Sequence, residues 1–355
     1  MEAAGEALRA LAAAVPGDPE ALRAACGRVA DWDSLAAEAE RDGLSGILWR
    51  DLERAGVAPP PRAARRIEEF VALQRLRQPQ LDAGLAGALG ALAAAGVHCA
   101  LLKGPLLGER LYGEAALRPS VDLDLLVAAA DLDRAAAALG AAGWRVPGGP
   151  TARWQRRHHH HLVLDRPGAP DLELHFRALT GFGGVMPAED LLARAAPGGF
   201  RGRPVRLLAP EDEVLHLAVH AAGHGLGRLL WLVDLKALLV SRPGLDWDAV
   251  AERARACGLG RAAAWAFAAV AGLGARVPPA ARALSWPRRR AAERASRTAI
   301  EAARPWSTAA SLVLNAILAD SPLAAARFMA ASLARVVRRR AARALGPRAP
   351  EAWSE

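Results

Sequence analysis

The chain has 355 residues, of which 52% are hydrophobic and 23% are charged. This length suits about two or three domains, and the hydrophobic content supports a large core and excludes wholesale disorder. The formal net charge of +9 favours anionic partners. Only Lys103 and Lys236 are lysines, however, and the excess of arginine and alanine is typical of a GC-rich genome. The charge therefore gives little support to nucleic-acid binding.

The cysteines and the apolar segments indicate the compartment. Cys26, Cys99 and Cys257 lie far apart and form no C-x-x-C pattern or disulfide framework, which favours a reducing environment. The N-terminus carries acidic residues and no long apolar run, so we expect no signal peptide. The longest uncharged apolar stretch, 262–275, is too short to span a bilayer. We therefore expect a cytoplasmic protein without a membrane span.

Residues 1–95 are predicted to form an N-terminal helical region. Leucine and alanine recur there at helical spacing, and proline-containing segments at 16–18 and 59–61 separate the helices. Nothing in the pattern assigns these helices a role.

The pattern changes in the next region, 96–208, which is predicted to hold an α/β core. A short apolar run at 97–102 predicts a buried strand, and Pro105 then opens a helix that extends through Tyr112. Residues 121–127 alternate with period two at their start, which predicts a second strand.

The rest of this core is predicted as a helix and two strands. Asp131 is expected to cap an alanine-rich helix that ends near Gly143. Strands are expected at 159–165 and 171–176, with a turn at 167–168 between them.

Residues 209–345 are predicted to form a C-terminal helical domain, followed by a tail at 346–355. A first helix begins at Pro210, where three acidic residues suit the positive end of the helix. Further helices are expected at 228–241, 246–257, 260–274, 291–303 and 308–343. The predicted fold class is therefore α+β, with a small mixed-sheet core flanked by N-terminal and C-terminal helical regions.

The acidic pair Asp122 and Asp124 is the strongest chemical signal. Residues two apart on a strand project from the same face, so the two carboxylates lie close together and repel each other unless a cation lies between them. Hard divalent ions such as Mg²⁺ take oxygen ligands of this kind. A carboxylate on a neighbouring strand would complete a two-metal site. Glu173 is the best candidate for it, and Asp171, on the same face, is the alternative.

Several blocks around this pair, in this order, resemble the uncharacterised nucleotidyltransferase family of the polymerase-β-like superfamily. The resemblance extends over about residues 85–275. Its blocks are Leu101 to Pro105, Tyr112-Gly113, Leu117 to Val127, Leu172 to Phe176, Leu215 to His220 and Trp231 to Asp234.

This resemblance implies a nucleotidyltransferase core that binds a nucleoside triphosphate, such as ATP, on two Mg²⁺ ions. Asp122, Asp124 and Glu173 would hold the metals, and the nucleotidyl group would pass to a hydroxyl acceptor: a small molecule, a peptide, a protein or RNA. One alternative is a related transferase that uses another activated donor, such as a sugar nucleotide. Another is a nucleotide-binding or partner-binding module without turnover.

The resemblance also implies a phosphate-binding loop around Gly104. Lys103-Gly104 stands where the superfamily usually has Gly-Ser, and Lys103 either contacts a phosphate as a point charge or is a solvated strand end. Arg118 pairs with a phosphate, with the acidic pair, or in a purely structural ion pair. Ser120 either caps the turn or donates to a phosphate.

Histidines form two further groups. His216, His220 and His224 are four residues apart on a predicted helix, so they form one stripe that lines the cleft, packs between domains or binds zinc. His175 shares the strand face of Glu173, and we assign His175 and His220 to the nucleotide site. Of the four histidines at 158–161, one or two are expected at the cleft and the others in solvent.

Overall fold

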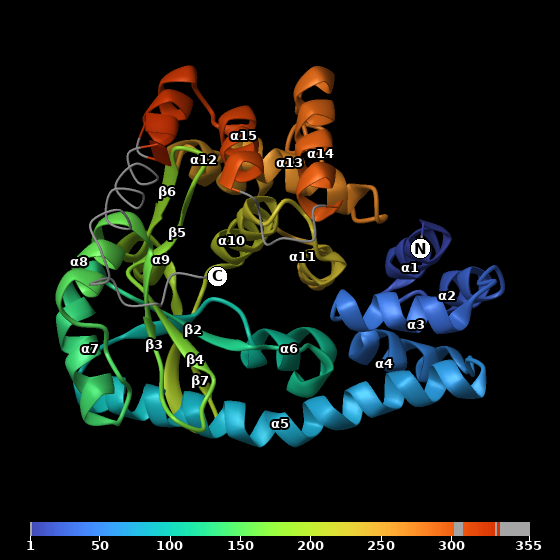
Figure 1. Ribbon diagram of the computed structural model, residues 1–355, viewed down its shortest axis with the longest axis horizontal. Helices are drawn as coiled ribbons and strands as arrows, with labels where there is room; N and C mark the ends of the chain where they lie inside the picture. The colour runs from blue at the N-terminus through green and yellow to red at the C-terminus, as the bar shows by residue number, and fades with distance from the viewer. Residues whose placement is uncertain (1, 302–307, 331, 334–355) are drawn as a thin grey trace, which may run out of the picture.

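The computed structural model describes residues 2–301, 308–330, 332 and 333. A mixed six-stranded sheet lies between helices, which confirms the α+β fold class (Figure 1). The N-terminal helices lie to one side of the sheet, and the C-terminal helices lie above it in this view. No helix among the described residues combines the length and the apolar character needed to cross a membrane.

The N-terminal region is helical, as predicted. Short aspartate-capped turns connect its first helices: the side chain of Asp18 accepts a hydrogen bond from Ala21 N, and that of Asp31 accepts one from Ser34 N. The helices are α1 (Glu2–Ala14), α2 (Pro19–Cys26), α3 (Trp32–Arg41), α4 (Ser45–Ala55) and α5 (Pro61–Ala94).

Helix α5 joins the N-terminal helices to the sheet. It has 34 residues, which at a rise of about 1.5 Å per residue makes it about 50 Å long. It contacts α3 and α4, and it also contacts strand β8 (Arg203–Leu207) and helix α7 (Leu132–Ala141). Figure 1 shows α5 running beneath both parts of the molecule. Helix α5 therefore packs against both the sheet and the N-terminal helices.

The sheet has the strand order β3-β4-β2-β1-β8-β7. The central pair β2 and β4 is parallel, as is β1 with β8, and the other neighbours are antiparallel. Buried leucines on one face pack toward α5 and α7 in a common core. The strands, apart from β8, are β1 (Cys99–Leu101), β2 (Asp122–Val127), β3 (His161–Leu164), β4 (Asp171–His175) and β7 (Ala196–Phe200).

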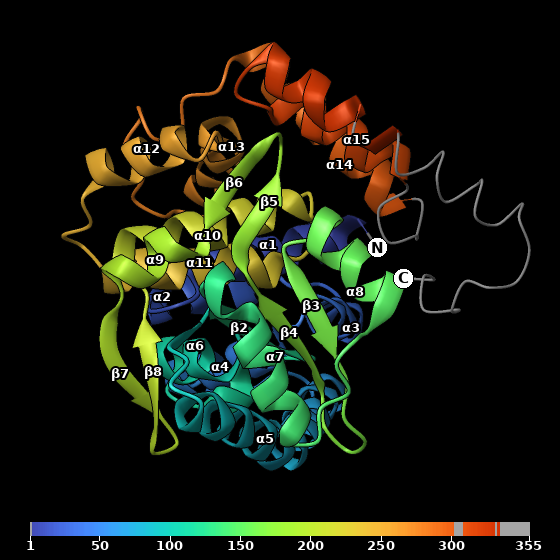
Figure 2. The ribbon, with the colours of Figure 1, turned by 90° about the vertical axis from the view of Figure 1, so that its left-hand side faces the viewer.

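A separate hairpin connects the sheet to the C-terminal helices. It consists of β5 (Arg177–Gly181) and β6 (Gly184–Pro187), and Figure 2 shows it extending toward the C-terminal helices. Phe182 N donates to Asn315 Oδ1 at 2.6 Å, and Val185 N donates to Cys257 O at 3.0 Å. This hairpin was not predicted from the sequence, and neither were the following helix α9 (Ala188–Arg194) and the β7–β8 hairpin.

Two predictions in the core need correction. The strand predicted at 159–165 begins at His161, because an unpredicted helix, α8 (Gly149–His158), occupies the preceding residues. Asp131 stands at the N-terminus of α7, but its side chain forms no capping hydrogen bond and instead pairs with Arg134 at 2.5 Å. The helix predicted from Pro105 is confirmed as α6 (Pro105–Tyr112).

The C-terminal region is helical, as predicted, but its last helix is shorter than expected. The prediction of a single helix at 308–343 is wrong, because the helix is interrupted at 319–321. The part of this prediction from 334 onward and the tail at 346–355 lie outside the described residues. Asp320 turns back to accept from Gly260 N and Arg261 N, and Ser321 caps the next helical segment. The helices are α10 (Pro210–Gly223), α11 (Leu229–Ser241), α12 (Trp247–Ala256), α13 (Gly260–Ala271), α14 (Trp286–Glu301) and α15 (Thr308–Leu318).

The core of the N-terminal helices continues into the later parts of the chain. Leu117, in the short 3₁₀ helix η1 (Ala115–Leu117), and Leu230 and Val233 of α11 are buried in the same cluster as the leucines of α1 and α4. The division into regions 1–95, 96–208 and 209–345 stays a prediction.

Gly46 allows α4 to approach η1 closely. A Cβ atom at Gly46 would lie 2.4 Å from the carbonyl oxygen of Leu117, so Gly46→Ala forces a backbone shift. We expect this substitution to lower the free energy of unfolding by about 2 kcal/mol. The matched control is Gly5→Ala in α1, where a Cβ meets nothing within 4 Å and alanine raises helix stability by up to about 1 kcal/mol. Urea denaturation of both variants checks the prediction, and a shift of the same sign in both would contradict it.

Candidate active site

The parallel pairing of β2 and β4 brings three acidic residues together. Asp124 is the register partner of Glu173, and Asp122 is the partner of Asp171. Glu173 and the buried Asp124 offer ligand oxygens within 4.8 Å of each other and of a nitrogen of His175. Asp171 is exposed at the start of β4. The structure therefore places Glu173, rather than Asp171, beside the buried acid.

Lys103 lies between the two aspartates. Its Nζ atom is 3.3 Å from Asp122 Oδ2 and 3.0 Å from Asp124 Oδ2, and its side chain is 15% exposed. Lys103 is therefore not a solvated strand end, and its ammonium group is the cation that holds the two carboxylates together.

Electrostatics distinguish the two aspartates. Burial and the charge of Asp124 hold the pKa of Asp122 above its ordinary value. Burial by itself also raises the pKa of Asp124, but Lys103 and His175 outweigh it and hold that pKa below the ordinary range. For Lys103, burial lowers the pKa, but the neighbouring acids raise it further, so the net shift is upward. Asp124 and Lys103 are thus a charged pair at neutral pH.

His175 connects the second acid pair. Its Nε2 atom lies 3.1 Å from Asp124 Oδ1 and 3.2 Å from Glu173 Oε2. Burial lowers the pKa of His175, but hydrogen bonds to both carboxylates raise it above the ordinary value. The other ring nitrogen, Nδ1, is buried and has no hydrogen-bond partner among the described residues. The predicted position of His175, on the strand face of Glu173, agrees with this geometry.

Gly104 shapes the loop that carries Lys103. Its backbone has φ +85° and ψ −145°, a conformation that residues with a side chain rarely adopt, and it directly precedes the first residue of α6. The nearest atom to a Cβ at this position would be Ser120 Oγ, at 3.9 Å. The loops of Gly104 and Ser120 therefore meet beside the acids.

Arg118 forms a structural ion pair, one of the alternatives considered for it. Its Nε and Nη2 atoms lie 2.9 and 2.8 Å from Asp234 Oδ2, and its Nη1 donates to Ser120 Oγ at 3.3 Å. The hydroxyl of Tyr112 donates to Asp234 Oδ1 at 2.7 Å. The partner is thus Asp234 of α11 rather than the acidic pair. Sequence reasoning gave Asp234 and Tyr112 no role, and no local pattern pairs residues so far apart.

The histidine stripe of α10 borders the acid site and also packs against α11. The rings of His220 and His224 are 4.7 Å apart, and Trp231 contacts both. Burial lowers the pKa of His216 to about 3, with smaller contributions from His175 and Lys103. Within the described residues, the stripe forms no group of three ligands at metal-binding distance.

Histidines at the start of β3 and just before it also lie close to the acids. His161 Nδ1 is 3.6 Å from Glu173 Oε2, and the ring centroids of His160 and His175 are 5.3 Å apart. The ring of His159 lies against Trp154 at a tilted angle, with a centroid distance of 4.5 Å, and the residue is half-buried. The side chain of His158 lies outside the described residues.

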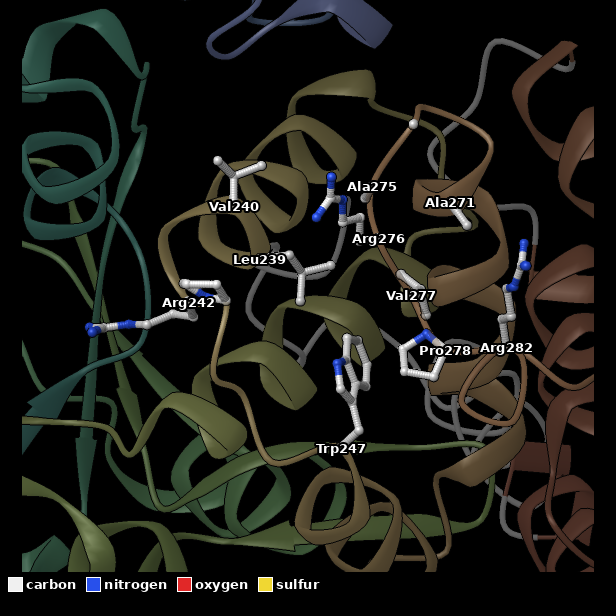
Figure 3. A pocket seen from close by; sticks show the side chains of 12 residues that line it. Leu239, Val240, Arg242, Trp247, Ala271, Ala275, Arg276, Val277, Pro278 and Arg282 are labelled. Carbon is white, nitrogen blue, oxygen red and sulfur yellow. The ribbon is translucent and has the colours of Figure 1, made fainter.

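A cavity of about 790 Å³ lies elsewhere, among the ends of α11, α12 and α13. Figure 3 shows Leu239 and Trp247 in its apolar wall, with the arginines Arg242, Arg276 and Arg282 around it. None of the acidic or histidine side chains described above lines this cavity.

A family match identifies the group of proteins to which this chain is related. The sequence matches the family described as uncharacterised nucleotidyltransferase over residues 28–273. No curated protein matches the chain. Among solved structures, the chain is similar to the antibiotic-resistance factor ANT(2'')-Ia, with 15% identity and a TM-score of 0.35, over 49% of this chain and 89% of the other. The family match extends over more than half of the chain and includes every acid and histidine of the site, so this protein belongs to the uncharacterised nucleotidyltransferase family.

Proposed function

We propose that this transferase moves a nucleotidyl group from a nucleoside triphosphate to a hydroxyl acceptor, with Mg²⁺ held by Asp122, Asp124 and Glu173. The observation that carries the proposal is the strand register, because it sets Glu173 directly beside Asp124 on the strand next to the acidic pair. Family membership supports nucleotidyl transfer in general. The donor, the metal and the acceptor class belong to the proposal.

The residues of the site fit a hard divalent ion. All three candidate ligands are carboxylates, the donor type that Mg²⁺ prefers. Asp124 is fully buried, whereas the side chains of Asp122 and Glu173 are 28% and 25% exposed, so a triphosphate can approach from their side. Bound Mg²⁺ would supply charge neutralisation of the phosphates and activation of the acceptor hydroxyl.

The other residues would position the donor. Lys103 has a flexible stem, so its ammonium group can leave the carboxylates for a phosphate oxygen without moving the backbone. Arg118 is held by Asp234 and acts on the site through Ser120, whose hydroxyl it contacts. Gly104 holds the loop in its positive-φ conformation, and the ring of His220 lies close enough to Lys103 to interact with its charge. We propose nucleotide contacts for Lys103, Gly104, Ser120 and His220, and we propose that His175 supports the site through its contacts with Asp124 and Glu173.

Calorimetric titration of the four nucleoside triphosphates, with and without Mg²⁺, tests the proposal. We expect Mg²⁺-dependent binding of at least one of them, and we expect Asp122→Ala/Asp124→Ala to weaken it on the order of 100-fold, as loss of a metal site requires. Glu173→Ala is expected to weaken binding as well. Asp171→Ala is the matched control, because its exposed carboxylate is the register neighbour of Asp122 but lies away from the buried acids.

Two results would redirect the proposal. Binding that the double variant leaves unchanged would place the nucleotide elsewhere, and no binding at all would favour a module without turnover. Release of pyrophosphate in the presence of an acceptor would separate nucleotidyl transfer from transfer of a sugar from a sugar nucleotide.

A further inference from the structure

Three imidazole rings from different parts of the core converge next to the acids. His160 lies in the turn after α8, His161 is the first residue of β3, and His175 is the last residue of β4. His161 and His175 are cross-strand register partners. The ring centroids are separated by 4.6, 5.0 and 5.3 Å, and one ligand atom from each ring lies within 4.8 Å of the other two.

Two of these rings make hydrogen bonds of the kind that orient histidines at metal sites. His175 directs Nε2 at Asp124 and Glu173, so its Nε2–H donates to carboxylates and leaves Nδ1 with a lone pair. His160 Nδ1 lies 3.2 Å from the hydroxyl of Thr180, which can accept its proton and leave Nε2 free. Histidines that ligate metals almost always donate their other N–H to a carboxylate, a backbone carbonyl or water, and the contacts of His175 are of this kind.

Two of the remaining ring nitrogens make no hydrogen bond within the described part of the chain, although Glu173 Oε2 lies 3.6 Å from His161 Nδ1. The Nδ1 atoms of His161 and His175 are buried and have no hydrogen-bond partner among the described residues. The side chain of His175 is 5% exposed, so water does not readily satisfy it. A buried nitrogen left without a partner costs about 1 to 3 kcal/mol. Two such atoms in one cluster indicate that a ligand completes it.

We propose that His160, His161 and His175 bind one divalent transition-metal ion of the zinc class, separate from the Mg²⁺ of the carboxylates. Three imidazoles suit Zn²⁺, Co²⁺ or Ni²⁺ and not Mg²⁺. With Zn–N bonds of about 2.0 to 2.1 Å, tetrahedral ligands lie about 3.3 Å apart. The ligand atoms, which lie within 4.8 Å of one another, therefore close in by up to about 1.5 Å on binding, and the fourth position stays open for water or a substrate atom.

An ion at this position would also organise the acid site. It would fix the segment that carries His160 against the start of β3 and the end of β4, and it would hold the ring of His175 in the orientation that supports Asp124 and Glu173. The ion is thus a positioning element for the carboxylates. This proposal does not depend on nucleotidyl transfer, because the histidines can bind the ion without nucleotide or Mg²⁺.

The test is metal binding by the full chain without an affinity tag, stripped with a chelator and free of Mg²⁺ and nucleotide. Zn²⁺ affinity is measured by competition with a chromogenic chelator, and Co²⁺ is added to record the visible absorption of imidazole coordination. We expect one equivalent of Zn²⁺ per chain. His160→Gln and His161→Gln are each expected to lower the affinity at least tenfold, and Thr180→Val about tenfold through loss of the outer contact.

The controls separate this ion from the carboxylate site and from stray binding. His98→Gln removes an exposed histidine at the start of the core, and Asp122→Ala removes a carboxylate without touching the rings; both are expected to retain full Zn²⁺ affinity. Circular dichroism establishes that each variant is folded. The proposal is overturned if the wild type binds no Zn²⁺ under these conditions, if the His160→Gln and His161→Gln variants bind it equally well, or if Asp122→Ala abolishes binding.

Discussion

Replacing Asp234 by alanine is expected to lower the free energy of unfolding by about 3 to 5 kcal/mol, because it leaves a buried guanidinium without its partner. The side chains of Arg118 and Asp234 are 5% and 1% exposed, so water cannot compensate for the lost carboxylate. Tyr112 loses the acceptor of its hydroxyl at the same time. Urea denaturation, in which the variant shows a lower midpoint at an unchanged slope, measures this effect.

Tyr112→Phe is the matched control for this prediction. It removes one hydrogen bond to Asp234 but leaves the ion pair with Arg118, so we expect a cost of about 1 to 2 kcal/mol. The combined variant Arg118→Met/Asp234→Leu replaces both charges with apolar groups and is expected to recover most of the stability that Asp234→Ala loses. Equal losses in Asp234→Ala and Tyr112→Phe would mean that the ion pair contributes nothing beyond the hydroxyl bond.

The ion pair also links the core of the N-terminal helices to the acid site. Asp234 lies on α11, which contributes Leu230 and Val233 to the core of the N-terminal helices. Through Arg118, the same residue holds Ser120 at the entrance to β2. A perturbation of α11 therefore reaches both the packing of the helices and the loop next to the acids. This coupling could not be predicted from the sequence, because Arg118 and Asp234 are 116 positions apart.

The acid site itself could be predicted to a useful extent. The two-residue period of a strand dictates that Asp122 and Asp124 share a face, and the same rule places His175 on the face of Glu173. The two-residue repeat of a strand does not predict the register between neighbouring strands. The pairing of Asp124 with Glu173 depends on how β2 and β4 pack together, and the position of Lys103 depends on the loop at Gly104.

The elements that escaped prediction lack the patterns on which prediction depends. Strand β7 has the sequence APGGF, in which glycine and proline hide any alternation of apolar and polar residues. Helix α8 is rich in arginine and has few apolar residues, so no apolar stripe at helical spacing marks it. The interruption of the last predicted helix does have a sequence signal, since Ser321 followed by Pro322 is a typical start of a new helix.

Replacing Lys103 by methionine is expected to make the stability of the protein depend on Mg²⁺. Methionine keeps the length and apolar stem of the side chain but removes the ammonium group that lies within 3.3 Å of both aspartates. In the presence of a chelator, the buried carboxylates then lack a cation, and we expect the free energy of unfolding to fall by about 3 to 5 kcal/mol at pH 8.

The pH dependence of this loss follows from Asp122. Its pKa is already held above the ordinary value by burial and by Asp124, and removal of Lys103 raises it further. A carboxyl group with a raised pKa in the folded state contributes its full stability at low pH and loses that contribution as the pH rises through the folded-state pKa. The deficit of Lys103→Met is therefore expected to shrink as the pH falls and Asp122 takes up a proton.

Mg²⁺ should restore most of the stability of Lys103→Met if the carboxylates bind this ion as proposed, because the ion replaces the missing charge. The wild type should gain less stability from Mg²⁺, since Lys103 competes with the ion for Asp122 and Asp124. Lys236→Met is the matched control: it removes the other lysine, which donates to backbone carbonyls of Ala12 and Ala13 far from the acids, so its stability should not respond to Mg²⁺. Recovery in Lys103→Met alone would identify the aspartates as the place where Mg²⁺ binds. If saturating Mg²⁺ does not restore the stability of Lys103→Met, these carboxylates pair with Lys103 and do not bind a metal. The proposed transfer reaction would then lose its central support.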